Sequence, residues 1–131
     1  MSNTRIVNGP GFRICYEDEP GFLRAYVFDG TDSLAVSSAM WQMLGAECDA
    51  AGMQRLLVVE DLLETVESAD IETVIAAVEA AGFGARRTAF VELRDDIQGS
   101  EQGEIYCRER GIALRVFSNE GEARRWLLYD G

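Results

Sequence analysis

The chain has 131 residues and a formal net charge of −11, and all twelve of its basic residues are arginine. Without histidine or lysine it cannot build a Ser-His-Asp triad, a P-loop lysine, a lysine Schiff base or an imidazole metal site. The negative charge disfavours nucleic acid and anionic membrane surfaces, because both attract basic faces. We therefore expect no catalytic residue set, no metal and no cofactor. The length suits a single domain over residues 1–131, with a core at about residues 11–129.

The sequence carries no pattern typical of secretion or of stable membrane association. Residues 1–5 lead into no apolar signal segment, and no apolar run approaches the ~20 residues of a membrane span. Cys15, Cys48 and Cys107 are far apart and lack zinc-type or redox spacing. A reducing, cytoplasmic location is the simplest interpretation, and a redox or intersubunit role for the thiols is the alternative.

Alternating polar and apolar side chains predict an antiparallel hairpin over residues 11–29. Pro20-Gly21 supplies its turn, because proline presets φ and glycine accepts a positive φ. An extension of the hairpin to residues 5–7 is left open. The loop that follows ends in Ser33, a residue type that caps helices.

The rest of the chain alternates between helical and strand patterns. Apolar residues at helical spacing, with capping residues before them and glycines after them, mark the helices. Short apolar runs mark the strands. Helices are expected at residues 34–51, from Ser68 or Asp70 to Gly82, at residues 101–110 and after Asn119, and strands at residues 56–59, 88–92 and 112–117.

This order predicts an α/β domain with one mixed sheet, in which an N-terminal antiparallel hairpin precedes mainly parallel strands. Strands separated by helices need crossover connections, which makes the later strands parallel. The apolar run at residues 56–59 is expected to be buried on both faces, at the centre of the sheet. Ligands of open α/β sheets bind beyond the carboxyl ends of the strands, where Glu60 and Asp61 stand.

Three segments carry a family resemblance. Val27-Phe28-Asp29-Gly30 precedes a Leu-led helix, Leu57-Val58-Val59-Glu60-Asp61-Leu62 closes an apolar strand on an acidic-Leu pair, and Val116-Phe117-Ser118-Asn119-Glu120 leads to Ala123 and Trp126-Leu127. Together they resemble the STAS-like group, which includes bacterial anti-sigma-factor antagonists and their "SpoIIAA-like" relatives. The likeness spans roughly residues 12–128. It implies a STAS-like fold and a non-enzymatic, regulatory function in protein binding.

The resemblance also draws attention to Ser68. In the antagonists, a serine that opens the helix after the central strand is phosphorylated by the anti-sigma kinase. The matching place here reads Glu67-Ser68-Ala69-Asp70, without the second serine and the glycine of the family motif. A phosphate on Ser68 would gain from the helix N-terminus and be repelled by the neighbouring acids. Ser68 is therefore interpreted as either a phospho-acceptor or a plain helix cap.

Acidic residues dominate the segment after the central strand. Oxygen-rich clusters suit Mg²⁺ or Ca²⁺, but the spacing here matches no known cage. The preferred interpretation is a rim that recognises another protein. Its predicted residues are Glu60, Asp61, Glu64 and Ser68.

Other interpretations remain open. The chain could instead carry a lipid or another small apolar ligand, or act as an enzyme that uses carboxylates or Cys107. A homodimer could form through the open hairpin edge. For Trp41 and Met43, ordinary core packing is the alternative to ligand contact. The residues proposed for an apolar cleft are Phe22, Tyr26, Phe28, Trp41 and Met43.

Overall fold

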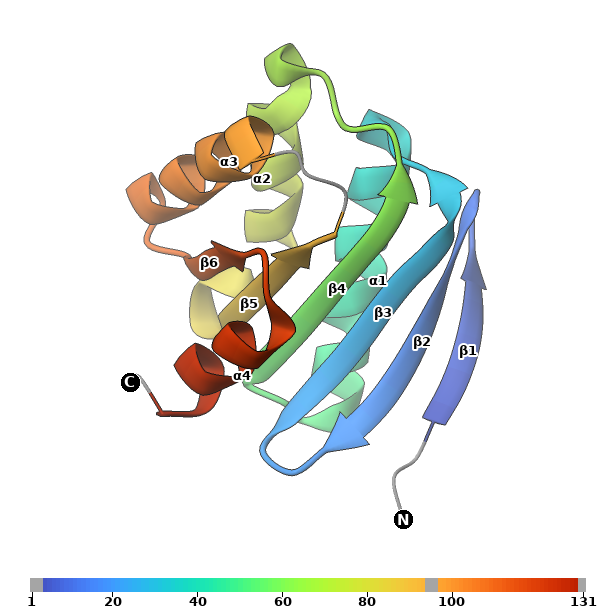
Figure 1. Cartoon of the computed structure of the whole chain (residues 1–131), viewed down its shortest axis with the longest axis vertical. Coiled ribbons are helices and arrows are strands. Elements are labelled where there is room, and N and C mark those ends of the chain that lie inside the picture. The colour runs from blue at the N-terminus through green and yellow to red at the C-terminus, as the bar shows by residue number, and fades with distance from the viewer. Residues whose placement is uncertain (1–3, 94–96, 130–131) are drawn as a thin grey trace.

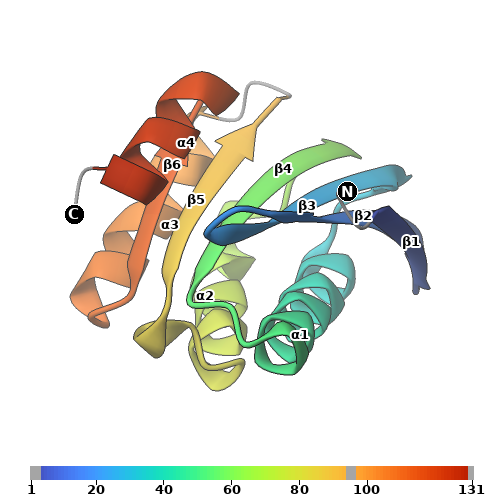
Figure 2. The same cartoon turned by 90° about the horizontal axis from the view of Figure 1, so that it is seen from below.

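The computed structural model describes residues 4–93 and 97–129, which form a six-stranded sheet with helices on both faces (Figures 1 and 2). Neighbouring strands in the sheet are also neighbours in the sequence. The strands are β1 (Thr4–Gly9), β2 (Phe12–Glu19), β3 (Phe22–Thr31), β4 (Arg55–Leu63), β5 (Arg87–Glu92) and β6 (Ala113–Phe117).

Each crossover between the parallel strands contains a helix, and the last helix follows β6. Two short 3₁₀ turns, η1 (Ser68–Asp70) and η2 (Phe83–Ala85), lie before and after the second helix. The helices are α1 (Leu34–Ala51), α2 (Ile71–Ala80), α3 (Ile97–Glu109) and α4 (Glu120–Tyr129).

The pairing confirms the predicted mixed α/β sheet. β1, β2 and β3 are antiparallel to one another, whereas β3, β4, β5 and β6 are parallel. The segment left open as an extension of the hairpin is a full strand, β1, which pairs with β2 along its whole length. The edge of the sheet on this side is therefore β1 and not β2. The sequence signal was weak because β1 is short and mostly exposed.

The central strand is buried on both faces, as predicted. Leu56 and Val58 pack into the core beneath α1 and α2, whereas Leu57 and Val59 pack against α4. Burial stabilises each such side chain by about 1.5–3 kcal/mol, so this strand anchors both layers. β4 is longer than the apolar run because Glu60 and Asp61 continue the pairing with β3.

The two faces of the sheet are covered unequally. α1, α2 and α3 cover one face, and α4 alone lies on the other (Figure 2). Ala123 and Leu127 of α4 pack on β4 and β5, and α4 reaches β3 at its first residues, where Phe22 is buried. Among the described residues, no helix covers β1, β2 and the rest of β3 on that face (Figure 1). In the described part of the chain, no helix combines the length and apolar character needed to cross a membrane.

Predicted caps explain several helix boundaries. The Val36 amide donates to the Ser33 hydroxyl at 3.1 Å, which caps α1. Gly52 ends that helix with a φ of 65°, a left-handed conformation that glycine adopts at little cost. The Glu122 amide donates to the Asn119 side chain at 3.0 Å, which confirms the predicted start of α4.

The starts of α2 and α3 differ from expectation. Asp70 occupies the cap position of α2 but makes no side-chain cap bond, and Ser68 opens the 3₁₀ turn instead. α3 begins at Ile97 rather than at residue 101. Its glycines lower helix propensity, but packing against α2 outweighs that local preference.

A close crossing joins α1 to the end of α2. A Cβ atom on Gly45 would lie 2.6 Å from the Ala81 carbonyl oxygen and 2.9 Å from its Cβ. The buried Arg86 locks this crossing by donating to the carbonyl oxygens of Ala81 and Gly45 and by pairing with Asp49. The crossing holds the helix layer against the sheet, and only glycine fits at position 45.

We expect Gly45→Ala to lower the free energy of unfolding by about 1–3 kcal/mol, because the added methyl group collides with backbone atoms. The matched control is Gly103→Ala in α3, where the new Cβ would meet Ile75 and Ile71 at 3.9 and 4.0 Å. That variant should be neutral or more stable, since alanine favours helices. Urea denaturation followed by circular dichroism measures both, and equal effects would contradict the interpretation.

Candidate functional site

The acidic pair at the end of β4 is divided between the two faces of the sheet. Glu60 is only 6% exposed and lines a cavity on the side of α2 and α3. Asp61 faces the other way and accepts a hydrogen bond of 2.5 Å from the Tyr26 hydroxyl. Alternation along a strand sends neighbouring side chains to opposite faces, so the pair cannot act as one site. The prediction that Glu60 belongs to a surface rim is therefore wrong.

The cavity has a volume of about 100 Å³ and lies where the carboxyl ends of β3, β4 and β5 meet α2 and α3. Its walls are mainly apolar, and one end holds Asp32, Glu60 and Glu92. Asp32 is buried and accepts hydrogen bonds from the Ser33 amide at 2.8 Å and the Ser37 hydroxyl at 2.7 Å. The cavity thus combines a carboxylate end with an apolar body.

The opposite side of β1, β2 and β3 presents what we call the open face, made of Ile6, Cys15, Tyr26 and Phe28. The strand register pairs Ile6 with Cys15 and Cys15 with Tyr26, which places these side chains in one row. Ile6 is 53% exposed, and the rings of Tyr26 and Phe28 lie 5.3 Å apart. The open face is therefore a row of apolar side chains that no helix of the described chain covers, and the guanidinium groups of Arg13 and Arg24 lie over its two aromatic rings.

Two further apolar side chains extend this side of the sheet at its carboxyl edge. Leu63 follows the buried Leu62 and is 52% exposed, and Leu93 follows β5 and is 50% exposed. The Leu93 amide donates to the Glu60 carbonyl oxygen, which places Leu93 beside β4. Leu63 and Leu93 therefore add exposed apolar area at the carboxyl edge of the sheet.

The predicted apolar cleft does not form from its five residues. Phe22 is buried beneath α4, with the Arg124 guanidinium over its ring. Tyr26 and Phe28 lie on the open face, whereas Trp41 and Met43 pack in the core on the other side of the sheet. Trp41 also lines the cavity described above.

The remaining predicted residues lie on the connection between β4 and α2. Glu64 and Ser68 are both exposed, and the Ser68 hydroxyl donates to the Gln102 side chain at 3.2 Å. Glu64 has a φ of 60°, which is unfavourable for a residue with a Cβ atom. Of the four predicted recognition residues, Asp61, Glu64 and Ser68 are thus accessible in part or in full.

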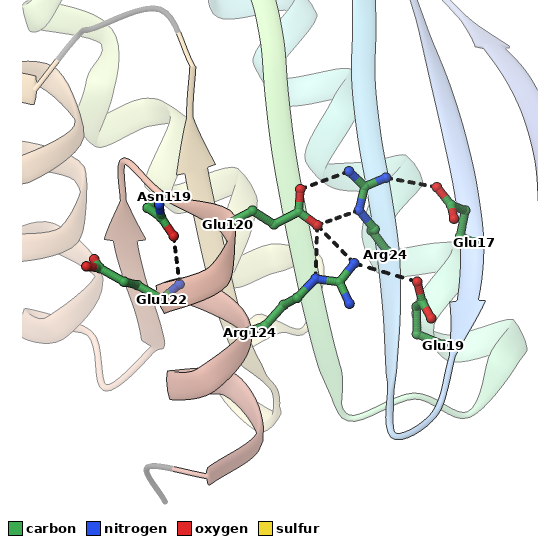
Figure 3. A network of polar contacts seen from close by, with 7 residues as sticks. All are labelled: Glu17, Glu19, Arg24, Asn119, Glu120, Glu122 and Arg124. Carbon is green, nitrogen blue, oxygen red and sulfur yellow. Dashed lines mark hydrogen bonds and ion pairs between the residues drawn. The ribbon is translucent and has the colours of Figure 1, made fainter.

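A network of ion pairs fixes α4 to the hairpin (Figure 3). Arg24 of β3 donates to both carboxylate oxygens of Glu120, at 2.9 and 3.0 Å, and to Glu17 at 2.9 Å. Arg124 pairs with Glu120 and with Glu19. The hydrogen bond from Arg24 holds the pKa of Glu120 below its usual value. The pairing of Arg124 with Glu120 could be predicted because the two residues are four apart on one helix, whereas sequence reasoning missed the pairs with Arg24 and Glu19, which lie far away in the chain.

The cysteines give little support to covalent chemistry. Cys48 and Cys107 are buried, and burial raises the pKa of their thiols to about 11 and about 12. Such thiols are mostly protonated at neutral pH and react slowly as nucleophiles. Within the described residues, no group of three or more acidic or cysteine side chains is arranged to hold a metal ion.

No family model matches this chain, and no curated protein sequence matches it. The resemblance to the STAS-like group therefore stays a prediction from the sequence pattern. The function has to be inferred from the geometry of the open face, its edge and the cavity.

We expect Glu64→Gly to raise the free energy of unfolding by about 0.5–1 kcal/mol, because glycine removes the cost of the left-handed backbone. The matched control is Glu67→Gly on the same connection, where φ is −56° and the backbone is unstrained. That variant should be less stable than wild type by a similar amount. Chemical denaturation of the two proteins should therefore show changes of opposite sign.

We expect Glu120→Gln to be less stable than wild type by about 1 kcal/mol at neutral pH, a value that allows for solvent screening of these partly exposed pairs. Because the pKa of Glu120 is lower in the folded protein than in the unfolded chain, its stabilising contribution is fully present at pH values above the usual glutamate pKa. It is lost as pH falls through the lower pKa of the folded state.

Urea denaturation at about pH 7 and about pH 3 tests the sign, and the difference between the two proteins should vanish in acid. Glu122→Gln is the control, because Glu122 is exposed on the same helix and forms no ion pair among the described residues. A difference that persisted in acid would contradict the role given to the Glu120 charge.

Proposed function

We propose that this chain is a non-enzymatic, cytoplasmic STAS-like module that regulates another protein by binding it through the open face and the adjoining carboxyl edge. The supporting observation is the half-sheet that α4 leaves uncovered, with an apolar row at its centre. Apolar and aromatic side chains of this kind bury well against a partner and stabilise an interface.

Neighbouring side chains hold the two aromatic rings of the open face in position. The Asp61 carboxylate holds the Tyr26 hydroxyl, and the Arg13 guanidinium lies over the Phe28 ring at 5.4 Å. Side chains held in place before association lose less conformational entropy when a partner arrives. Aromatic residues that are already fixed are therefore favourable anchors for an interface.

Charge around the open face favours a basic partner. Asp61 and Glu64 stand at the carboxyl end of β4, and the whole chain carries a net charge of −11, whereas Asp29 at the end of β3 pairs with Arg13 at 3.8 Å. Such a field attracts a positively charged protein surface and speeds its approach. We expect the partner to combine arginine or lysine side chains with an apolar strip.

The exposed hydroxyl of Ser68 is accessible to a kinase, which supports its prediction as a phospho-acceptor. Its bond to Gln102 ties the 3₁₀ turn to α3. A phosphate would replace that bond and add negative charge beside Glu67. Phosphorylation would thereby alter the rim next to Glu64 and change the affinity for the partner.

A lipid carrier fits less well than a protein-binding module. A cavity of about 100 Å³ is much smaller than the ~300–1,000 Å³ that ligand pockets usually offer. The aromatic residues expected to line a cleft are also divided between the two faces of the sheet.

We expect Ile6→Asp and Leu63→Asp to reduce binding of the partner by at least tenfold, because each places a charge in the apolar contact. The matched control is Ile105→Asp on α3, since Ile105 is 49% exposed but lies away from the open face. Pull-down from cells, followed by affinity measurement with the purified partner, compares the three variants with wild type.

The thiol of Cys15 provides a second measurement on the same face. A bound partner should slow its alkylation, while the buried Cys48 and Cys107 stay unreactive with or without partner. Equal loss of binding in all three aspartate variants, or undiminished binding in Ile6→Asp and Leu63→Asp, would rule out this surface. A dimer that Ile6→Asp dissociates would identify a second copy of the chain as the partner.

A further inference from the structure

We infer that the free edge of β1 pairs with the same edge of a second copy of this chain, so that the two sheets join into one. The inference goes beyond the proposed function, because it rests on backbone groups of β1 and not on the side chains that contact another protein. It is tested on the purified chain alone, so it can fail without the proposed function.

The two edges of the sheet, β1 and β6, differ in how they are protected (Figure 1). On β6, the Val116 amide donates to the Glu104 carboxylate at 2.7 Å. The Leu114 amide donates to the Ile112 carbonyl oxygen at 3.0 Å. β1 has no proline and no bulge in its pairing with β2, and no described strand pairs with its outer side. An edge without such protection readily accepts another strand.

The register of β1 against β2 shows which of its backbone groups point outward. Gly9 and Phe12 are register partners across a two-residue loop. The residues that flank such a loop form a hydrogen-bonded pair, and these pairs alternate with non-hydrogen-bonded pairs along the two strands. Every second residue of β1 therefore bonds to β2. The N–H and C=O groups that point to the free edge are those of Thr4, Ile6 and Asn8.

An antiparallel pairing centred on Ile6 satisfies all of these outward groups. It places Ile6 opposite Ile6 of the second copy, and Thr4 opposite Asn8, and each such pair exchanges both of its N–H···O bonds. A pairing centred on Val7 would set Ile6 against the polar Asn8 and leave Thr4 outside the ladder. The strand is thus self-complementary in one register, which favours a second copy of the chain as the occupant of this edge.

The side chains of β1 fit the same register. Ile6 is 53% exposed in the single chain, and its contact with Ile6 of the second copy buries apolar area and joins the two open faces into one row. Arg5 is the only charged residue of β1, and it is held by its own chain through Glu47 and through Asp18 at 3.7 Å. Arg5 lies opposite Val7 of the second copy, so no like charges meet between the two β1 strands.

Sedimentation of the purified full chain should show a reversible rise from 14.5 kDa to twice that mass as the concentration approaches about 1 mM. Each copy carries a net charge of −11, so added salt should strengthen the dimer by screening their repulsion. Amide hydrogen exchange at Ile6 and Asn8 should slow as the dimer forms. The Val116 amide should be protected at every concentration, because its partner lies in the same chain.

Two variants of β1 test the edge. Asn8→Pro removes an outward N–H, whereas the pairing of β1 with β2 is kept because proline is tolerated where the N–H faces solvent. Ile6→Lys places like charges opposite each other. Each should raise the dimer dissociation constant by at least about tenfold. Ala113→Lys is the matched control, because Ala113 is exposed on the β6 edge, and it should leave the dimer unchanged.

Asn8→Pro also separates this inference from the proposed function. It leaves the side chains of the open face in place, so binding of another protein there should be unchanged while the dimer is lost. Leu63→Asp should do the reverse, since Leu63 lies on β4, away from the β1 edge.

Oxidative crosslinking with diamide determines the register. In a Cys15→Ser background, Ile6→Cys should form a disulfide between two copies, because the Cα atoms of a hydrogen-bonded antiparallel pair lie about 5.5 Å apart. Val7→Cys in the same background should not, since the two Val7 positions are not opposite each other in this register.

Three results would overturn the inference. The first is a chain that stays monomeric at about 1 mM in added salt, including a chain whose β1 edge instead pairs with a strand of another protein. The second is a dimer that Ile6→Lys leaves intact or that Leu63→Asp dissociates, which would place the contact away from the edge. The third is crosslinking through Val7→Cys but not through Ile6→Cys. None of these results depends on whether Asn8→Pro folds.

Discussion

The fold depends on the burial of the four apolar side chains from Leu56 to Val59, which are removed from water on both faces of the sheet. The helices are arranged to cover these side chains on one face or the other. Two of these side chains pack beneath α1 and α2, and two beneath α4. Because a parallel strand buried on both sides needs helices above and below it, a three-to-one division of helices satisfies β4 while leaving the outer strands partly bare. One helix, α4, is enough to bury the apolar side chains of β4 and β5 on its face, so the outer strands on that face stay uncovered.

The position of α4 decides how much of that face stays open. Apolar contacts of Ala123 and Leu127 seat the helix on the parallel strands, and Arg24 ties its first turn to β3 through Glu120. This ion pair joins α4 to the neighbouring strand at the border of the open face (Figure 3). With its first turn held at that border, α4 does not extend over Ile6 and Cys15.

The end of β4 shows how one strand serves two surfaces. Glu60 and Asp61 are adjacent in sequence, but the pleat directs the first into the cavity and the second to Tyr26 on the open face. The helix side of the strand end therefore lines a partly open pocket, while the other side belongs to the open face.

Local sequence patterns by themselves determine the order of helices and strands and most of their boundaries. The apolar run of β4, the caps at Ser33 and Asn119 and the glycine at position 52 act over a few residues, so the α/β order and the main boundaries could be predicted. The residue types also limited the chemistry, since a chain without histidine or lysine has few ways to catalyse.

Only the tertiary structure decided which side chains meet. The register of β1, β2 and β3 creates the row from Ile6 to Tyr26, and the crossing at Gly45 fixes α1 against the end of α2. The buried position of Glu60 and the bond between Arg24 and Glu120 depend on contacts between residues far apart in the chain. Such contacts follow from how whole faces pack, and a sequence pattern that repeats every two to four residues carries no information about them.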